Sequence, residues 1–158
     1  MKGSDLAAFY PELASEDYVT PFAVFHQRYA TNTLPTWHRA QPGRTLGHNG
    51  EINTVWGNRA RMAARDSTLP VECKPVLTQG GTDSTSLDEA VELISHNGRT
   101  LAEAMRMVMP PAAVSGHTSP FLRYHSDCTE PWDGPAAIAF ANGRLVGAGP
   151  SHGSVQSE

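Results

Sequence analysis

LGHNGEINT, residues 46–54, is the stretch on which the interpretation of the whole chain depends. An apolar run before Asn49-Gly50 predicts a short strand over residues 44–48, and apolar spacing of three to four predicts a helix over residues 52–65. A strand-to-helix corner exposes backbone N–H groups at the positive end of the helix dipole. The Asn49 amide and the Gly50 N–H are thus candidate donors to one developing negative oxygen. Taken alone, an Asn-Gly pair is more often a plain turn.

The flanking sequence predicts a mixed α+β domain. Capping boxes start two helices, at Ser86 and at Thr100, and Asn142-Gly143 has the composition of a two-residue hairpin. Both flanks of this hairpin are apolar, so we expect it inside a sheet covered on both sides. The remaining expected elements are a helix over residues 4–13, a buried strand over residues 21–27, and hairpin strands over residues 135–141 and 144–148.

Composition excludes several classes of protein. The chain has 158 residues and a net charge of -4, which argues against a nucleic-acid-binding domain. No run is long enough for a membrane span, and no secretory signal is visible. Cys73 and Cys128 are the only cysteines and form no disulfide framework, so we expect a cytoplasmic protein. The seven histidines show no HExxH motif, so no metal site is predicted.

Arg28 and Asp83 are the candidate groups for binding a charged ligand. Arg28 ends the apolar run over residues 21–27, where a guanidinium can grip a carboxylate through two parallel hydrogen bonds. The alternative is a surface arginine paired with a nearby acid. Asp83 follows Gly80-Gly81 and can receive an ammonium group, and the alternative for it is a helix cap or an Asx turn.

Several runs of sequence resemble, in the same order, the glutamine amidotransferase domain of glutamate synthases. They are RYATNTLPTW (28–37), RAQP (39–42), LGHNGEINT (46–54), Asp83-Ser84 and EPWDGPAA (130–137). The resemblance covers residues 1–148 and makes them a partial type 2 glutamine amidotransferase domain. Residues 149–158, rich in Gly and Ser, are expected to be a disordered or aberrant tail.

The resemblance implies an N-terminal-nucleophile hydrolase fold, an αββα sandwich of which this chain is an incomplete fragment. It implies L-glutamine as the ligand, with Arg28 on the α-carboxylate, Asp83 on the α-ammonium, and Asn49 and Gly50 as the oxyanion hole. The family releases ammonia from glutamine, and the intact enzyme delivers it to 2-oxoglutarate. The expected partners are the remaining domains of the parent enzyme. FMN and an iron–sulfur cluster are expected in those later domains, and no cofactor is expected in this segment.

The family's nucleophile is a cysteine at the start of the mature chain, whose own α-amine acts as the base. This sequence begins with Met1, and neither Cys73 nor Cys128 can replace that residue. We therefore expect a chain that is inactive alone. Two alternatives remain open: a non-catalytic module that senses glutamine or docks on a partner, and the domain of another class II enzyme, such as the phosphoribosyl or asparagine type.

Overall fold

A small antiparallel sheet forms the centre of the structure, a computed structural model that describes residues 2–27, 29, 33–110 and 119–151. Its strands are β1 (Leu46–Gly50), β2 (Ala136–Ala141) and β3 (Val146–Ser151), in the order β1-β2-β3. The register pairs Leu46 with Phe140 and Gly50 with Ala136. The expected mixture of helix and strand and the expected hairpin are both confirmed, but the loop between the strands covers residues 142–145 and not Asn142-Gly143 alone.

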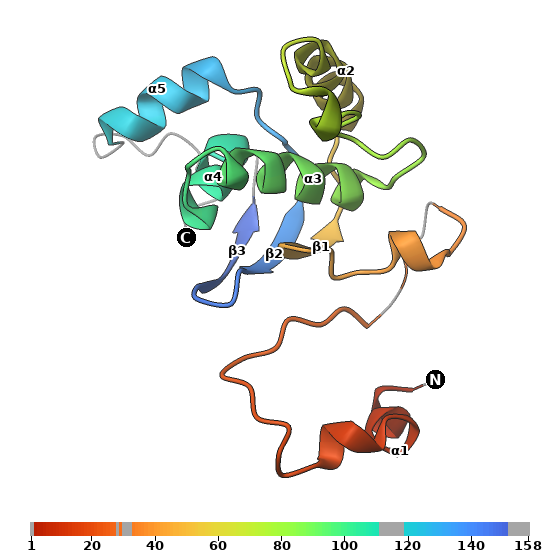
Figure 1. Ribbon diagram of the computed structural model, residues 1–158. Coiled ribbons are helices and arrows are strands. Elements are labelled where there is room, and N and C mark those ends of the chain that lie inside the picture. Colours follow the sequence, from red (N-terminus) through yellow and green to blue (C-terminus); the bar gives the residue numbers. More distant parts are fainter. Residues whose placement is uncertain (1, 28, 30–32, 111–118, 152–158) are drawn as a thin grey trace.

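Helices lie over one face of this sheet (Figure 1). The longest two are α2 (Val55–Asp66) and α3 (Asp83–His96), followed by α4 (Leu101–Val108) and α5 (Pro120–Cys128). Short 3₁₀ turns cover Trp37–Arg39 and Val71–Cys73. Among the described residues, no helix is both long and apolar enough to cross a membrane.

The core lies between the sheet and α3 and α4. Along β2, Ala136 and Ile138 are buried while Ala137 between them is exposed, because successive strand side chains point to opposite faces. Within the described residues, helices thus cover one face of the sheet, whereas the sequence predicts a hairpin covered on both sides. The inner face packs on the apolar stripes of the helices, with a core made up of Leu46, Ile52, Met62, Leu87, Ala90, Val91, Leu101, Ala104, Met105, Val108, Trp132, Ala136 and Ile138.

Helix starts follow local hydrogen bonds of the first turn. At α4 the capping box predicted at Thr100 is confirmed: its hydroxyl accepts from Glu103 N, and the Glu103 carboxylate accepts from Thr100 N. At α3 the prediction is wrong by one turn. Thr82 is the N-cap, accepting from Thr85 N, while Ser86 lies inside the helix and its hydroxyl donates to the carbonyl of Thr82. A second Ser/Thr one turn earlier competes for the same role.

The N-terminal segment extends away from the sheet (Figure 1). The predicted helix over residues 4–13 is broken into the 3₁₀ turn Gly3–Asp5, the single turn α1 (Leu6–Phe9) and the 3₁₀ turn Pro11–Ala14, because Pro11 has no N–H to continue a helix. The predicted strand over residues 21–27 is also wrong. That stretch pairs with no strand among the described residues, and Phe25 is 83% exposed.

The C-terminal strand runs further than the sequence predicts. In β3, Gly149, Pro150 and Ser151 pair with Ile138, Ala137 and Ala136. Residues 149–151 therefore continue the strand, at positions where the sequence predicts a tail. Residues 152–158 lie outside the described residues.

Candidate functional site

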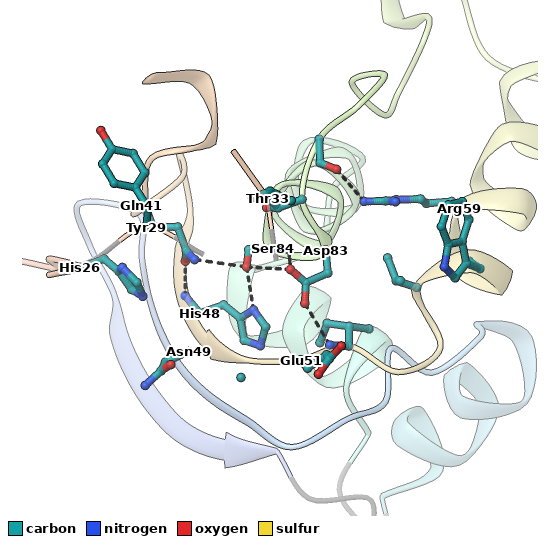
Figure 2. A pocket seen from close by; sticks show the side chains of 16 residues that line it. His26, Tyr29, Thr33, Gln41, His48, Asn49, Glu51, Arg59, Asp83 and Ser84 are labelled. Atoms are coloured by element: carbon teal, nitrogen blue, oxygen red, sulfur yellow. Dashed lines mark hydrogen bonds between the residues drawn. The ribbon is translucent and has the colours of Figure 1, made fainter. Parts of the chain in front are cut away.

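A cavity of about 230 Å³ lies beside the end of β1 and the first turn of α3 (Figure 2). Three of the predicted site residues, Asn49, Gly50 and Asp83, line it together. Arg28, the fourth, lies outside the described residues. The Asn-Gly corner and the acidic residue thus line one cavity, and their roles in it stay predictions. The other lining residues are His26, Tyr29, Thr33, Gln41, His48, Glu51, Ile52, Val55, Trp56, Arg59, Gly81, Thr82 and Ser84.

Asp83 links α3 to the corner directly. Its Oδ2 accepts the backbone N–H of Ile52 at 3.0 Å, and its Oδ1 accepts the N–H of Ser84 at 2.7 Å. A carboxylate has about four lone-pair sites, so Asp83 keeps acceptor capacity for a cation in the cavity. The side chain therefore combines two roles, fixing the residue two positions after Gly50 and offering negative charge to a ligand.

The corner itself is built by close backbone contact between the two most distinctive sequence motifs. A Cβ on Gly50 would lie 2.0 Å from the carbonyl oxygen of Pro135, and one on Gly134 would lie 1.9 Å from the carbonyl oxygen of Glu51. Glu51 N donates to Pro135 O at 3.0 Å. Gly50 also has a φ of 146°, which side-chain-bearing residues rarely adopt. Only glycine therefore fits at position 50.

The segment 130–135 is anchored to α2 on its other side. Asn58 Nδ2 donates to Pro131 O at 3.0 Å, and Asp133 N donates to the hydroxyl of Thr54 at 2.9 Å. Trp132 is 1% exposed in the core. The segment EPWDGPAA (130–137) thus contacts the backbone of the Asn49-Gly50 corner and contributes no side chain to the cavity lining. The sequence signal for this role is Gly134, within the EPWDGPAA motif. Its role follows from its contact with Glu51, which is far away in the sequence.

The Asn49 amide is available as a donor. Asn49 is exposed and follows His48, which is 2% exposed, so the two side chains point to opposite faces of β1. The Asn49 side chain makes no hydrogen bond within the described part of the chain. The Asn49 amide thus keeps both of its N–H donors for a ligand.

His48 directly precedes the Asn49-Gly50 corner in β1, and its Nδ1 is hydrogen-bonded to the Ser84 hydroxyl at 2.7 Å (Figure 2). Burial lowers the pKa of His48 below its ordinary 6.5; the negative charge of Asp83 opposes this shift and His26 adds to it. The imidazole is therefore neutral at neutral pH. Sequence analysis did not select His48, Ser84 or Gln41 for the site, because their contacts join positions far apart in the chain.

Two arginine side chains bind the glycine-rich loop, Gly80-Gly81, that precedes α3. Arg59 donates to Gly81 O at 2.8 Å and to the Ser86 hydroxyl at 2.9 Å, while Arg39 donates to Gly80 O at 2.7 Å. The Arg59 guanidinium also lies 5.7 Å from the ring centroid of Trp56. These contacts fix the loop that precedes Asp83, a role that the RAQP motif alone did not indicate.

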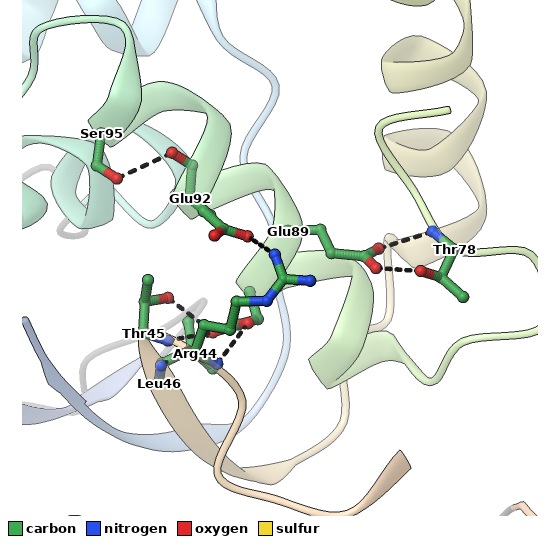
Figure 3. A network of polar contacts seen from close by, with 8 residues as sticks. Arg44, Thr45, Leu46, Thr78, Glu89, Glu92 and Ser95 are labelled. Atoms are coloured by element: carbon green, nitrogen blue, oxygen red, sulfur yellow. Dashed lines mark hydrogen bonds and ion pairs between the residues drawn. The ribbon is translucent and has the colours of Figure 1, made fainter. Parts of the chain in front are cut away.

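A second polar network fixes the start of β1 (Figure 3). The Asp88 carboxylate, on a residue 6% exposed, accepts the backbone N–H groups of Arg44, Thr45 and Leu46 at 2.9–3.0 Å and the Thr45 hydroxyl at 2.7 Å. Arg44 forms an ion pair with Glu92 on the next turn of α3. Asp88 thus ties the entry to β1 to the same helix that carries Asp83.

The described residues contain no group of three His, Cys, Asp or Glu side chains placed to hold a metal ion. Cys73 and Cys128 are both exposed, and neither lines the cavity. An iron–sulfur cluster is usually held by four cysteines, so a chain with two does not fit that group by itself. No step of the chemistry below passes through it.

Comparison with known proteins gives the family. The family model of the class-II glutamine amidotransferases matches residues 1–150. The chain belongs to this family. Ferredoxin-dependent glutamate synthase 2 of Arabidopsis thaliana is 41% identical over 94% of this chain, and the glutamate synthase [NADPH] large chain of Azospirillum brasilense is 43% identical over 91%. Ferredoxin-dependent glutamate synthase 2 of Synechocystis is 43% identical over 91%. The amidotransferase chain spans about a tenth of the length of these relatives.

Proposed function

We propose that this chain supplies the glutamine-binding and oxyanion-stabilising part of a glutamate synthase glutaminase site. In the parent enzyme the ammonia released from glutamine passes to 2-oxoglutarate. The observation that supports this most directly is the cavity shared by Asn49, Gly50 and Asp83, with Asp83 hydrogen-bonded to the backbone of the corner. The cavity thus offers a negative charge and amide donors to one small ligand, which suits an amino acid with a side-chain carbonyl.

The two ends of glutamine bind through different groups. Asp83 receives the α-ammonium on the lone pairs that Ile52 and Ser84 leave open. Arg28 receives the α-carboxylate in the two-bond geometry of a guanidinium. His26 and Tyr29, on either side of it in the sequence, line the cavity. Buried partners for both charges reject molecules that lack either one.

The corner acts on the reacting carbonyl. When a nucleophile attacks the side-chain carbon of glutamine, negative charge develops on the carbonyl oxygen, and the Asn49 amide and Gly50 N–H donate to it. Loss of one such donor lowers turnover by about 10²–10³. The nucleophile is a cysteine from a segment outside this sequence, since neither Cys73 nor Cys128 reaches the cavity. Alone, the chain binds glutamine and does not hydrolyse it.

The αββα sandwich is part of the same proposal. One face of the sheet carries α3 and α4, and the other borders a hollow of about 310 Å³ that is lined by small strand residues and by Phe25 and His26. A second sheet packing on that face completes the sandwich. Gly47, Ala137 and Ala139 lie on this hollow and permit the close approach that sheet packing requires.

A chimera tests the proposal. Residues 1–150 replace the matching stretch of the Azospirillum brasilense large chain, and glutamine-dependent and ammonia-dependent glutamate formation are measured. We expect both activities, and we expect Asp83→Ala to abolish only the glutamine-dependent one, because added ammonia bypasses the glutaminase site. An Asp83→Ala chimera that keeps both activities contradicts the assignment. Ammonia release by the unaltered 158-residue chain contradicts the assignment of the nucleophile to another segment.

Glutamine sensing without hydrolysis is the second candidate, favoured by the position of both cysteines outside the cavity lining. The chimera separates the two functions. A sensor gives a chimera that binds glutamine and lacks glutamine-dependent glutamate formation, while the ammonia-dependent activity of the parent stays intact.

A further inference from the structure

A closed ring of hydrogen bonds holds His48 at the position directly before the corner. The backbone N–H of His48 donates to Gln41 Oε1 at 2.6 Å, Gln41 Nε2 donates to the Ser84 hydroxyl at 3.2 Å, and that hydroxyl contacts His48 Nδ1 at 2.7 Å. Figure 2 shows the three side chains facing one another. Both the backbone and the side chain of one strand residue are thereby tied to the first turn of α3.

One assignment of hydrogens uses every contact of this ring and the Ser84–Asp83 contact as well. A backbone N–H only donates, so Gln41 presents its oxygen to His48 and its NH₂ to Ser84. The Ser84 hydroxyl has one hydrogen, which goes to Asp83 Oδ1 at 3.3 Å. His48 Nδ1 then carries the hydrogen that it shares with Ser84. Each hydrogen bond of the ring then has one donor and one acceptor.

The ring of hydrogen bonds and Asp83 together hold the residues on both sides of the Asn49-Gly50 corner. Before it, His48 is bound to Ser84, and after it, Ile52 N is bound to Asp83. Because neighbouring strand side chains point to opposite faces, fixing the His48 side chain also fixes the direction of the Asn49 amide. The two anchors, Asp83 and Ser84, are adjacent residues of α3, so the spacing between oxyanion donors and carboxylate is set within one helical turn.

We propose that His48, Ser84 and Gln41 are positioning residues that hold the Asn49-Gly50 corner at a fixed distance from Asp83, with His48 as the neutral Nδ1–H tautomer. The proposal rests on the proposed function for its consequence in glutamine binding. The three residues act through Asn49 and Asp83 and are not assigned a reacting atom.

The burial of His48 supports the neutral tautomer. Its Nε2 is buried without a hydrogen-bond partner among the described residues, so a hydrogen placed there would be an unsatisfied buried donor. Burial also lowers the pKa of His48, which agrees with a neutral ring. The charged or titratable groups that act on it are Asp83 and His26, from α3 and the segment before β1.

A pair of amide substitutions separates positioning from packing. His48→Asn places an NH₂ near the position of Nδ1 and keeps a donor to Ser84, whereas His48→Gln reaches the position of Nε2 and loses that contact. Ser84→Ala removes the contact from the other side. Thr100→Ala, at the N-cap of α4 away from the cavity, is the matched control for lost stability. All variants are made in the full chain.

The readouts are glutamine affinity by calorimetry, amide hydrogen exchange at Glu51 and Ile52, whose N–H groups are bound to Pro135 O and Asp83, and the ¹⁵N signals of the His48 ring. We expect His48→Asn to bind glutamine like the parent chain, and His48→Gln and Ser84→Ala to bind about tenfold more weakly, the loss of one hydrogen bond. Thr100→Ala lowers stability and leaves affinity unchanged. Equal affinities of His48→Asn and His48→Gln, or an Nε2–H tautomer in the parent chain, overturn the proposal.

Failure of the proposed function gives a different result. A parent chain that does not bind glutamine contradicts the glutamine site, and positioning is then judged by exchange alone. We expect exchange at Glu51 and Ile52 to rise about tenfold in His48→Gln and to stay unchanged in His48→Asn, since each lost hydrogen bond is worth about that factor. Equal exchange in both variants overturns the positioning role by itself.

Discussion

Replacing Gly50 by alanine tests whether the corner depends on close backbone contact. The added Cβ would lie 2.0 Å from Pro135 O and 2.8 Å from Ala136 Cα, both backbone atoms of the supporting segment that no rotamer change can move away. The φ of 146° adds about 1–3 kcal/mol of backbone strain. Overpacking adds about 1–3 kcal/mol. We therefore expect Gly50→Ala to lower the free energy of unfolding by roughly 2–6 kcal/mol.

Two other glycines provide matched controls. Gly98 has a φ of 86° and Gly57 lies within α2, and neither would bring its Cβ within 4 Å of a described neighbouring atom. Gly98→Ala thus has only the backbone cost of about 1–2 kcal/mol. Gly57→Ala is expected to stabilise by about 0.5–1 kcal/mol through helix propensity.

Urea unfolding followed by far-UV circular dichroism measures all three variants against the parent chain. The expected order of stability is Gly57→Ala, parent, Gly98→Ala, Gly50→Ala. The difference between the last two isolates the contact with Pro135 and Ala136. A Gly50→Ala variant within about 0.5 kcal/mol of Gly98→Ala would refute this account of the corner, since overpacking normally costs more.

Three further substitutions have defined outcomes. Burial lowers the pKa of His48, so below pH 6.5 the unfolded chain binds a proton at this residue more readily than the folded chain does. The free energy of unfolding therefore falls as the pH drops from 6.5 toward the folded-state pKa. Urea titrations at several pH values should show that this part of the pH dependence is missing from His48→Asn. Burial raises the pKa of Glu130, but the hydrogen bonds and charge of Arg65 outweigh it and the net pKa is below 4.5. The contribution of Glu130 is therefore present above pH 4.5 and lost below it, and Glu130→Gln should cost about 1 kcal/mol at pH 7 and little at low pH, as measured by thermal unfolding at both values. Asp88→Asn turns one acceptor of a cluster of backbone N–H groups into a donor and should cost about 2–4 kcal/mol in urea unfolding; a cost below 0.5 kcal/mol would contradict its role at the start of β1.

Local patterns predict the elements whose causes are local. The capping box at Thr100 and the hairpin at Asn142-Gly143 are both set by residues within one turn, and both are confirmed. The predicted start of α3 is wrong because Thr82, one turn before Ser86, is equally suitable as an N-cap by sequence and takes that role. The apolar stretch 21–27 matches a strand in composition, but a strand also needs a pairing partner.

The candidate site also combines features that local sequence predicts with features that depend on contacts between distant residues. The strand-to-helix corner and the helix start near Asp83 are each signalled locally, whereas their meeting at one cavity depends on the contact between Asp83 and Ile52. The sequence does not reveal that Gly134 meets Glu51 or that Gln41 reaches Ser84, because these contacts join positions far apart in the chain. The roles of the individual site residues stay predictions.

The most direct test is a titration of the ¹⁵N-labelled chain with L-glutamine, followed at the Gly50 N–H and the Asn49 side-chain amide. The reference ligand is glutaramic acid, which keeps the carboxamide and lacks the α-ammonium that Asp83 is expected to bind. We predict that glutamine shifts both signals saturably and that glutaramic acid binds at least about tenfold more weakly, since a hydrogen bond to a charged group is lost. Equal affinities for the two ligands, or shifts confined to residues outside the cavity, would contradict the account.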